Sequence, residues 1–350
     1  MDLRTMNIHR QRDFKRWQQF LEANGIHVFN EREVRPVEQT FGWFDGDQLV
    51  ATGSVAGNVL KYIAIASDYQ ENGATFNMVV SQLVSAAAQQ GQFHLMVFTK
   101  PQYVKSFQYV GFTLLAQTEM GAVLETGMPT ISTYLKGLPR VKNQQDKRVA
   151  GIVMNANPFT RGHRFLVEQA SRENDVVYVF VVSQDASLFT TAERTKLVQA
   201  GTADLKNVLV VPGREYMVSG ATFPAYFLKD DQNVGRYQAA LDATLFKKQV
   251  APALNITARY LGSEPYSKTT EVYNEELHRI LPPEITVRII NRTAIVDGTI
   301  VTATKVRAAL AADDAEQVAR LVPSTTMAYV KENWDELRQR AQERMRQNGD

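Results

Sequence analysis

The sequence predicts an α/β protein whose second half is a doubly wound parallel sheet covered by helices. From residue 149 onward, short apolar runs alternate with amphipathic helical patterns, which is typical of parallel strands buried on both faces. The chain has 350 residues, more than the roughly 100 to 200 of one domain, so two domains are expected. Residues 138–148 have a proline and almost no apolar content, which indicates a linker between them.

These patterns fix the expected elements of the second half. Its strands are predicted at 149–154, 176–182, 208–211, 256–261 and 285–290. Its helices are predicted near 161–172, 191–200, 234–250, 269–281 and 304–312. The predicted domains are therefore 1–140 and 148–330, followed by a charged helix or frayed tail at 331–350.

Composition narrows the function classes. The 44% of hydrophobic and 22% of charged residues are those of an ordinary globular protein. Lys and Arg total 39 against 37 Asp and Glu, so no large basic field favours a nucleic-acid partner. The absence of cysteine excludes disulfides, thiolate metal sites and a cysteine nucleophile. No apolar run approaches the roughly 18 residues of a membrane span and no signal-peptide core is evident, so a cytoplasmic protein without a membrane partner is expected.

The first domain is predicted to mix strands and helices in an α+β arrangement. A helix is expected at 13–23, a hairpin at 40–55 around Asp45 and Gly46, and further elements at 59–66, 78–84, 93–99, from 101, and after 112. This order, with Gln70 and Gly73 framing a turn before a helix, resembles the GNAT acyltransferase fold and its coenzyme A loop. Thr75 departs from that family's usual Gly or Ala, so what this domain binds stays open.

The strongest motif runs from Asn157 to His163. It follows the first strand of the second domain and opens its first helix. Doubly wound sheets bind nucleotides at this edge, where the strands end. His163 could donate to a phosphate oxygen while the helix start adds positive potential, and Gly162 would allow close approach of the ligand. A lone histidine would more often pack or cap the helix. The whole string, however, resembles the nucleotidyltransferase signature, and the residues expected to bind the nucleotide are Asn157, Pro158, Phe159, Thr160, Gly162 and His163.

A second string, from Val301 to Arg307, lies near the end of the domain and resembles another motif of the nucleotidyltransferase superfamily. Thr302 or Thr304 could cap the helix that follows, leaving its amides for phosphates. Arg307 lies about one turn into that helix, where its guanidinium could pair with the leaving pyrophosphate. Lys305 would add a second cation. A plain helix cap is the alternative interpretation.

Two further segments are candidates for ligand contact. Gly262, Ser263 and Glu264 follow an apolar strand and resemble an adenine- and ribose-binding segment, although Glu264 could be an ordinary loop carboxylate. Lys268 could reach a phosphate or be solvated. Small, hydroxyl and aromatic residues at 219–229 suit a pocket for a small anion, with Ser219 and Thr222 as its candidates, or a packed loop.

The domain order and these strings together resemble the citrate lyase ligase family over nearly the whole chain. The resemblance implies an AMP-forming ligase that uses ATP to activate acetate and acetylates the prosthetic-group thiol of the citrate lyase acyl-carrier subunit, which activates the lyase. It implies catalytic roles for His163, Lys305 and Arg307, with no protein metal ligands and Mg²⁺ carried by the ATP phosphates. The thiol must be external because the chain has no cysteine.

Three other functions remain open at this point. The same strings occur in adenylyltransferases that join AMP to a phosphorylated cofactor precursor. The chain could also be a GNAT acetyltransferase with a nucleotide-sensing second half, or a scaffold that binds ATP without turnover. The sequence does not indicate the oligomeric state.

Overall fold

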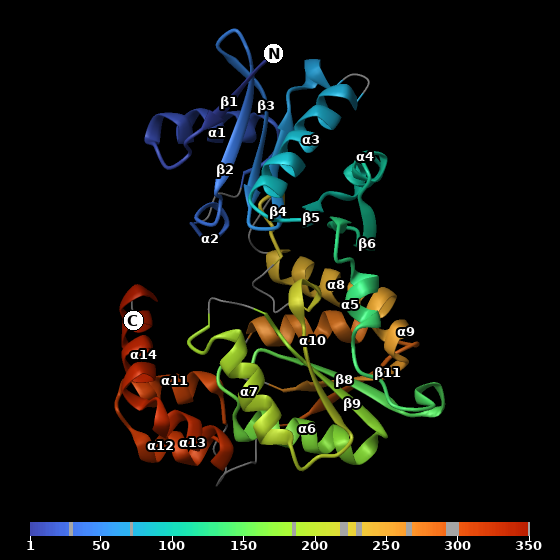
Figure 1. The fold of residues 1–350 in the computed structure, drawn as a ribbon, viewed down its shortest axis with the longest axis vertical. Helices are drawn as coiled ribbons and strands as arrows, with labels where there is room; N and C mark the ends of the chain where they lie inside the picture. Colours follow the sequence, from blue (N-terminus) through green and yellow to red (C-terminus); the bar gives the residue numbers. More distant parts are fainter. Residues whose placement is uncertain are drawn as a thin grey trace. The chain divides into compact units, whose positions relative to one another are not determined.

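The computed structural model describes residues 1–27, 31–70, 73–183, 187–217, 223–228, 233–263, 268–291 and 301–348 (Figure 1). The chain forms two compact units. Unit 1 contains Met1–Lys136 and Phe223–Lys248, and unit 2 contains Gly137–Thr222 and Gln249–Asp350. The α/β class predicted from the sequence is confirmed in both units.

Unit 1 is built on a mixed seven-stranded sheet in the order β1-β2-β3-β4-β5-β7-β6. Its strands are β1 (Asp2–Met6), β2 (Gln39–Asp45), β3 (Gln48–Ala56), β4 (Val59–Ile65), β5 (His94–Thr99), β6 (Thr113–Gln117) and β7 (Ala122–Gly127). Neighbours pair antiparallel except β4 and β5, which run parallel. The β4 and β5 ladder joins Val59 to Met96 and Leu60 to Val97. Beyond those pairs the two strands part, and this opening positions a cavity described below.

The helices of unit 1 cover this sheet. They are α1 (Gln11–Ala23), α2 (Glu31–Val34), α3 (Ala74–Gln89), α4 (Val104–Tyr109), α5 (Ile131–Lys136) and α8 (Val234–Leu245). The amphipathic α1 turns Trp17 and Leu21 inward, where both are fully buried. The predicted hairpin is confirmed, and Gly46 at its turn has a φ of 58°, the left-handed conformation that glycine adopts without strain. Strand β1 was not predicted.

Helix α8 was predicted among the helices of the second domain, yet it packs in unit 1. The Gln238 side chain donates to the Phe223 carbonyl, and the Phe98 and Phe223 rings lie 4.9 Å apart. Gly121 leaves room for the Tyr237 ring, because a Cβ there would lie 2.5 Å from it. Helical periodicity at 234–250 predicts a helix but cannot say which sheet that helix covers.

Unit 2 contains a fully parallel five-stranded sheet in the order β10-β9-β8-β11-β12. Its strands, all predicted, are β8 (Val149–Met154), β9 (Val176–Val181), β10 (Val208–Pro212), β11 (Ile256–Gly262) and β12 (Thr286–Ile290). The chain builds one side of the sheet outward from β8 and then crosses to β11 on the other side. The strand order therefore reverses between β8 and β11, which is the position where doubly wound sheets bind ligands.

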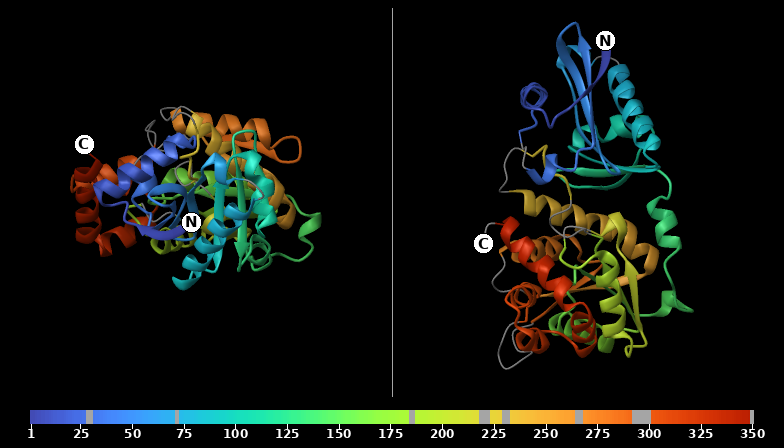
Figure 2. Two further views of the ribbon diagram at one scale, coloured as in Figure 1. Left: turned by 90° about the horizontal axis from the view of Figure 1, so that it is seen from above. Right: turned by 60° about the vertical axis from the view of Figure 1, so that its left-hand side comes forward.

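The helices of unit 2 are α6 (Arg161–Glu173), α7 (Thr191–Thr202), α9 (Ala251–Leu254), α10 (Lys268–Ile280), α11 (Ala303–Ala311), α12 (Ala315–Leu321), α13 (Ser324–Glu332) and α14 (Trp334–Asn348). A π-helical turn, Phe246–Val250, precedes α9. Figure 2 shows α11 to α14 as one group at the end of the chain. Helices α12 and α13 were not predicted. Among the described residues, no helix is both long and apolar enough to cross a membrane.

Two segments expected to be exposed are in fact packed. In the predicted linker, Gln144 is buried and donates to the Leu254 carbonyl at 2.6 Å, while the Tyr178 hydroxyl donates to the Pro139 carbonyl at 2.5 Å. The charged C-terminal segment forms α14, which buries Leu337 and Ala341. Two apolar residues four positions apart are enough to give a charged helix one buried face.

Candidate functional site

The first turn of α6 is organised by a reciprocal cap between Thr160 and His163. The Thr160 hydroxyl accepts from the His163 backbone N–H at 3.3 Å, and His163 Nδ1 accepts from the Thr160 backbone N–H at 3.1 Å. Because Nδ1 is an acceptor, the neutral imidazole carries its proton on Nε2. The cap thus fixes a ring that presents Nε2 as a donor, the chemistry expected for a contact with a phosphate oxygen.

The imidazole is also fixed from its face. The Phe159 ring stacks on it with 5.9 Å between centroids and 18° between planes, and Phe159 is fully buried. Phe159 fits against α7 because position 201 is glycine, where a Cβ would lie 2.5 Å from Phe159 Cε1. His163 itself keeps 9% of its surface exposed. Phe159 therefore belongs to the core, and its predicted nucleotide contact stays a prediction.

The turn between β8 and α6 is braced by a residue that the sequence did not single out. Arg194, in the first turns of α7, is completely buried. Its guanidinium donates to the Asn155 carbonyl at 2.9 Å and to the Val182 carbonyl at 2.6 Å, and Nε donates to the Phe189 carbonyl at 3.1 Å. The signal for it was an arginine three positions before Leu197, on the apolar face of the predicted helix.

The turn has its own constraints. Ala156 adopts a φ of 49°, which is rare for a residue with a side chain. The Asn157 side-chain oxygen accepts from the Phe189 backbone N–H at 3.0 Å, and the Asn157–Pro158 peptide is cis. Side-chain bonds therefore hold an uncommon backbone shape between the end of β8 and the start of α6.

The two strings from opposite ends of unit 2 meet at this turn. Arg307 Nη1 donates to the Asn157 carbonyl at 2.8 Å, although the residues are 150 positions apart. Arg307 Nη2 donates to the Thr304 hydroxyl at 3.1 Å, and Thr302 caps α11 by accepting from the Lys305 backbone N–H at 3.2 Å. The structure thus brings the beginning of α6 and the beginning of α11 to one edge of the parallel sheet.

The guanidinium of Arg307 is partly buried. Burial lowers its pKa from the ordinary value, and the positive charge of Arg344 lowers that pKa further. Lys305, in the first turn of α11, is exposed. A negatively charged ligand beside Arg307 would oppose this lowering of its pKa.

The remaining candidates are placed only in part. Gly162 is buried in the first turn of α6. Gly262 ends β11, the strand beside β8, and the Ser263 backbone N–H donates to the Ile290 carbonyl at 2.9 Å. Lys268 begins α10, but its side chain is not described. Ser219, Thr222 and Glu264 lie outside the described residues.

A family model described as the citrate lyase ligase C-terminal domain matches residues 149–330. This match contains both strings and the whole parallel sheet. The chain belongs to the citrate lyase ligase family. The family resemblance predicted from the strings is confirmed, and the chain is accordingly an enzyme.

Similarity to other citrate lyase ligases extends over both units. The citrate (pro-3S)-lyase ligase of Escherichia coli K12 is 33% identical over 335 residues, which covers 94% of this chain and 93% of that protein. The one from Klebsiella pneumoniae is 37% identical over 291 residues, covering 81% and 84%. Unit 1 also resembles the solved aminoglycoside 6′-N-acetyltransferase from Enterococcus faecium, with a TM-score of 0.32 and 10% identity over 37% of this chain and 98% of that one.

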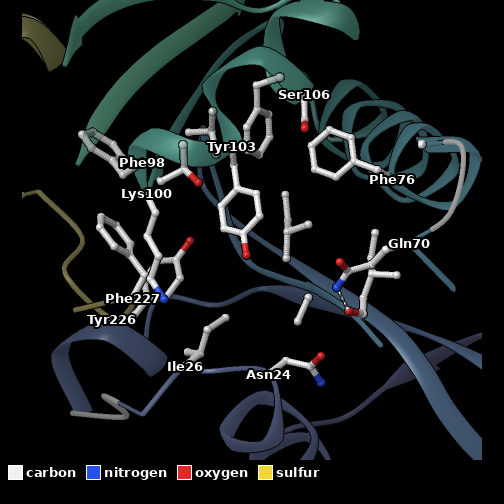
Figure 3. A pocket seen from close by; sticks show the side chains of 17 residues that line it. Asn24, Ile26, Gln70, Phe76, Phe98, Lys100, Tyr103, Ser106, Tyr226 and Phe227 are labelled. Carbon is white, nitrogen blue, oxygen red and sulfur yellow. Dashed lines mark hydrogen bonds between the residues drawn. The ribbon is translucent and has the colours of Figure 1, made fainter. Parts of the chain in front are cut away.

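Unit 1 of this citrate lyase ligase family member contains a cavity of about 210 Å³ where β4 and β5 part (Figure 3). Figure 3 shows the Tyr103 ring projecting between Phe76 on one side and Phe98 with Phe227 on the other. Gln70 and Gly73 also line the cavity. Helix α3 begins directly after Gly73, which has a φ of 67° and gives the helix no side-chain cap. The cavity therefore has aromatic side chains in its wall and reaches the start of a 16-residue helix.

The aromatic wall includes residues that the sequence did not assign to unit 1. Tyr226 and Phe227 lie within segment 219–229, which was predicted as an anion pocket or a packed loop of the second domain. This segment is fixed in unit 1 by the Glu33 carboxylate, which accepts from the Ala225 backbone N–H at 2.8 Å and pairs with buried Lys61. Burial lowers the pKa of the Lys61 amine, which the neighbouring Glu33 opposes.

Proposed function

We propose that this chain uses ATP to activate acetate as acetyl-adenylate and then acetylates the prosthetic-group thiol of the citrate lyase acyl-carrier subunit, thereby activating the lyase. Membership of the family supports the ligase activity. The hydrogen bond from Arg307 to the Asn157 carbonyl is the main structural support, because it joins the two strings that the proposal assigns to one nucleotide.

Different residues would bind the different parts of the nucleotide. His163 and Thr160, at the start of α6, would bind phosphate, as Nε2 of the oriented ring is a donor. Arg307 and Lys305, at the start of α11, would stabilise the pyrophosphate. Gly262 and Ser263, together with Glu264, would contact the nucleoside. Ser219, Thr222 and Lys268 would bind acetate or a phosphate beside it.

Catalysis in this scheme is positioning and charge neutralisation. An acetate oxygen attacks the α-phosphorus, and the bond from that phosphorus to the bridging oxygen breaks to release pyrophosphate. Arg307 and Lys305 offset the negative charge that develops on the leaving group, and no protein nucleophile is needed. Mg²⁺ would arrive on the phosphate oxygens of ATP with its remaining ligands supplied by water. The carrier thiolate then attacks the acetyl carbon, releasing AMP.

The cavity of unit 1 would receive the CoA-like prosthetic arm of the carrier. Where β4 and β5 part, their facing backbone edges can bond the amides of an extended arm. The aromatic walls suit its methylene groups, and the start of α3 suits a phosphate. This assignment gives unit 1 a binding role in the ligase reaction.

The test follows AMP and pyrophosphate from ATP with labelled acetate and deacetylated carrier, omitting each component in turn. The proposal expects AMP release and label on the carrier only when all three are present. AMP-containing dinucleotide as the stable product would instead indicate an adenylyltransferase. Acetyl transfer from acetyl-CoA without ATP would indicate a GNAT acetyltransferase.

A histidine pair tests the site itself. His163→Ala is expected to keep the fold but lose pyrophosphate release by a factor of about 100 or more. His278→Ala, at an exposed position of α10, is the matched control and should keep the full rate. Equal rates in the two variants would refute the assignment of His163.

A further inference from the structure

The carboxylate of Glu193, in the first turn of α7, accepts hydrogen bonds from three parts of unit 2. The Thr190 backbone N–H donates to it at 2.6 Å and completes the capping box that begins α7. The Tyr329 hydroxyl of α13 donates at 2.9 Å, and Arg340 Nη1 of α14 donates to the two oxygens at 3.0 and 3.1 Å. Glu193 therefore joins the start of α7 to two helices of the C-terminal group (Figure 1).

The pair of Glu193 with Arg340 is sheltered from solvent. The side chain of Glu193 is 16% exposed and that of Arg340 is 31% exposed. Burial alone would raise the pKa of Glu193, but the bonds from Thr190, Tyr329 and Arg340 outweigh it and lower that pKa. The carboxylate is therefore ionised at neutral pH, and its bonds to the arginine and the tyrosine are charge-assisted.

The cap that Glu193 completes is connected to the turn between β8 and α6. Phe189 and Thr190 have consecutive backbone amides. The Phe189 N–H donates to the Asn157 side-chain oxygen at 3.0 Å, and the next N–H, of Thr190, donates to Glu193. Asn157 also accepts from Arg307 through its carbonyl. A shift of the Glu193 carboxylate would therefore be passed through one peptide unit to Asn157.

A second connection begins at the residue after Glu193. Arg194 donates to the Asn155 carbonyl at 2.9 Å and to the Asn155 side-chain oxygen at 2.8 Å. Asn155 precedes Ala156, the residue of this turn with a positive φ. Contiguous hydrogen-bond networks of this kind can couple positions that share no direct contact.

We propose that Arg340 and Tyr329 are positioning residues for the ligase reaction. Through Glu193 they fix the first turn of α7, which holds the turn between β8 and α6 in the geometry that presents His163 to ATP. The inference rests on the proposed placement of ATP at that turn. It gives α14, which lies beyond the residues 149–330 matched by the family model, a part in the reaction.

Two arginines of α14 form a matched pair for the test. Arg338 is 35% exposed and also pairs with a carboxylate, but its partner Asp313 follows α11 and does not belong to α7. In the full chain with ATP, acetate and carrier, Arg340→Met is expected to lower kcat for pyrophosphate release about tenfold. The KM for ATP should change less than about twofold, because misplaced groups cost most in the transition state. Arg338→Met should keep kcat within about twofold of the wild type.

A double-mutant cycle with His163→Ala separates positioning from a general loss of structure. Without the imidazole that the turn presents, adding Arg340→Met should lower kcat less than about threefold, against about tenfold in the wild-type background. A merely structural role predicts the same factor in both backgrounds. Arg340→Lys keeps the charge but not the planar fork, and it should recover kcat to within about threefold of the wild type.

The outcomes separate this inference from the proposed function. Equal kcat losses in Arg340→Met and Arg338→Met, an unchanged kcat in Arg340→Met, or equal factors in the two backgrounds overturn the inference while His163→Ala stays slow. A wild-type rate in His163→Ala shows instead that the nucleotide site is misplaced, and the inference falls with it. Should melting curves show that Arg340→Met does not fold, Tyr329→Phe decides, since it removes only the hydroxyl that donates to Glu193. The inference expects its kcat to be about threefold lower, and a wild-type kcat contradicts it.

Discussion

The turn between β8 and α6 is bordered by α7 on one side and α11 on the other, and each helix sends an arginine to it. Arg194 of α7 donates to the Asn155 carbonyl and Arg307 of α11 to the Asn157 carbonyl. Arg194 is fully buried and bonded to carbonyls of three segments, whereas Arg307 is partly exposed and burial lowers its pKa. Arg194 therefore fixes the backbone of the turn, whereas Arg307 is the arginine that we propose also binds an anion.

This difference separates stability from activity and can be tested by substitution. Arg194→Met should lower the free energy of unfolding by about 3 to 5 kcal/mol, because several buried carbonyls lose their donor. Urea denaturation measures the loss. Arg320→Met, at an exposed pair with Glu316, is the control and should cost less than about 1 kcal/mol. Similar losses for the two variants would show that Arg194 does not brace the turn.

For Arg307, the comparison predicts a loss of reaction rate. Arg307→Gln should reduce acetate-dependent pyrophosphate release by a factor of about 10² to 10³, since the lost cation acts on the leaving group. Its free energy of unfolding should change by less than about 1 kcal/mol, because Arg307 is partly exposed. Initial rates and denaturation curves on one preparation give both quantities. A large loss of stability with an intact rate would reverse the roles of the two arginines.

Packing beneath α7 gives a smaller effect. Gly201→Ala should destabilise the fold by about 1 to 3 kcal/mol, because the new methyl group would overlap the Phe159 ring. Since that ring stacks on His163, a lower pyrophosphate release rate should accompany the loss. Gly235→Ala in α8 is the control, as a Cβ there meets nothing within 4 Å. Its stability should stay the same or rise.

The smallest expected effect on stability comes from the ion pair of Arg164 with Asp204, just after the C-terminal end of α7, and it depends on pH. Arg164 of α6 donates to both carboxylate oxygens of Asp204, which lowers the pKa of that group to about 2. A lowered folded-state pKa means that the stabilisation is present above the ordinary value of 3.8 and is lost as pH falls towards 2. Because Asp204 is exposed, Asp204→Asn should cost less than about 1 kcal/mol at pH 6. The difference from the wild type should shrink as pH falls through about 2, and unfolding at several pH values checks this.

Local features of unit 2 were predictable from the sequence. Its five strands are short apolar runs, and the Thr160 cap stands next to the helix it starts, so both signals lie within a few residues. The candidate site was predicted to the extent that its strings resemble known motifs. Which of Thr302 and Thr304 caps α11 could not be chosen in advance, and the structure assigns the cap to Thr302.

Long-range contacts were not predictable. The bond from Arg307 to Asn157 depends on strand order, and the place of α8 in unit 1 depends on side-chain packing across a sheet. Arg194 was missed because arginine in a helix is usually solvated, whereas here the carbonyls of neighbouring loops surround it. Periodicity reports that a face is buried, not what buries it.

The central claim is that His163 and Arg307 serve one nucleotide. The most direct test is a double-mutant cycle of His163→Ala and Arg307→Gln on ATP affinity, measured by calorimetry. Groups that share a ligand should couple, so we expect an interaction energy of more than about 0.5 kcal/mol between the two substitutions. Strictly additive losses, or an ATP affinity that neither substitution changes, would contradict a shared site.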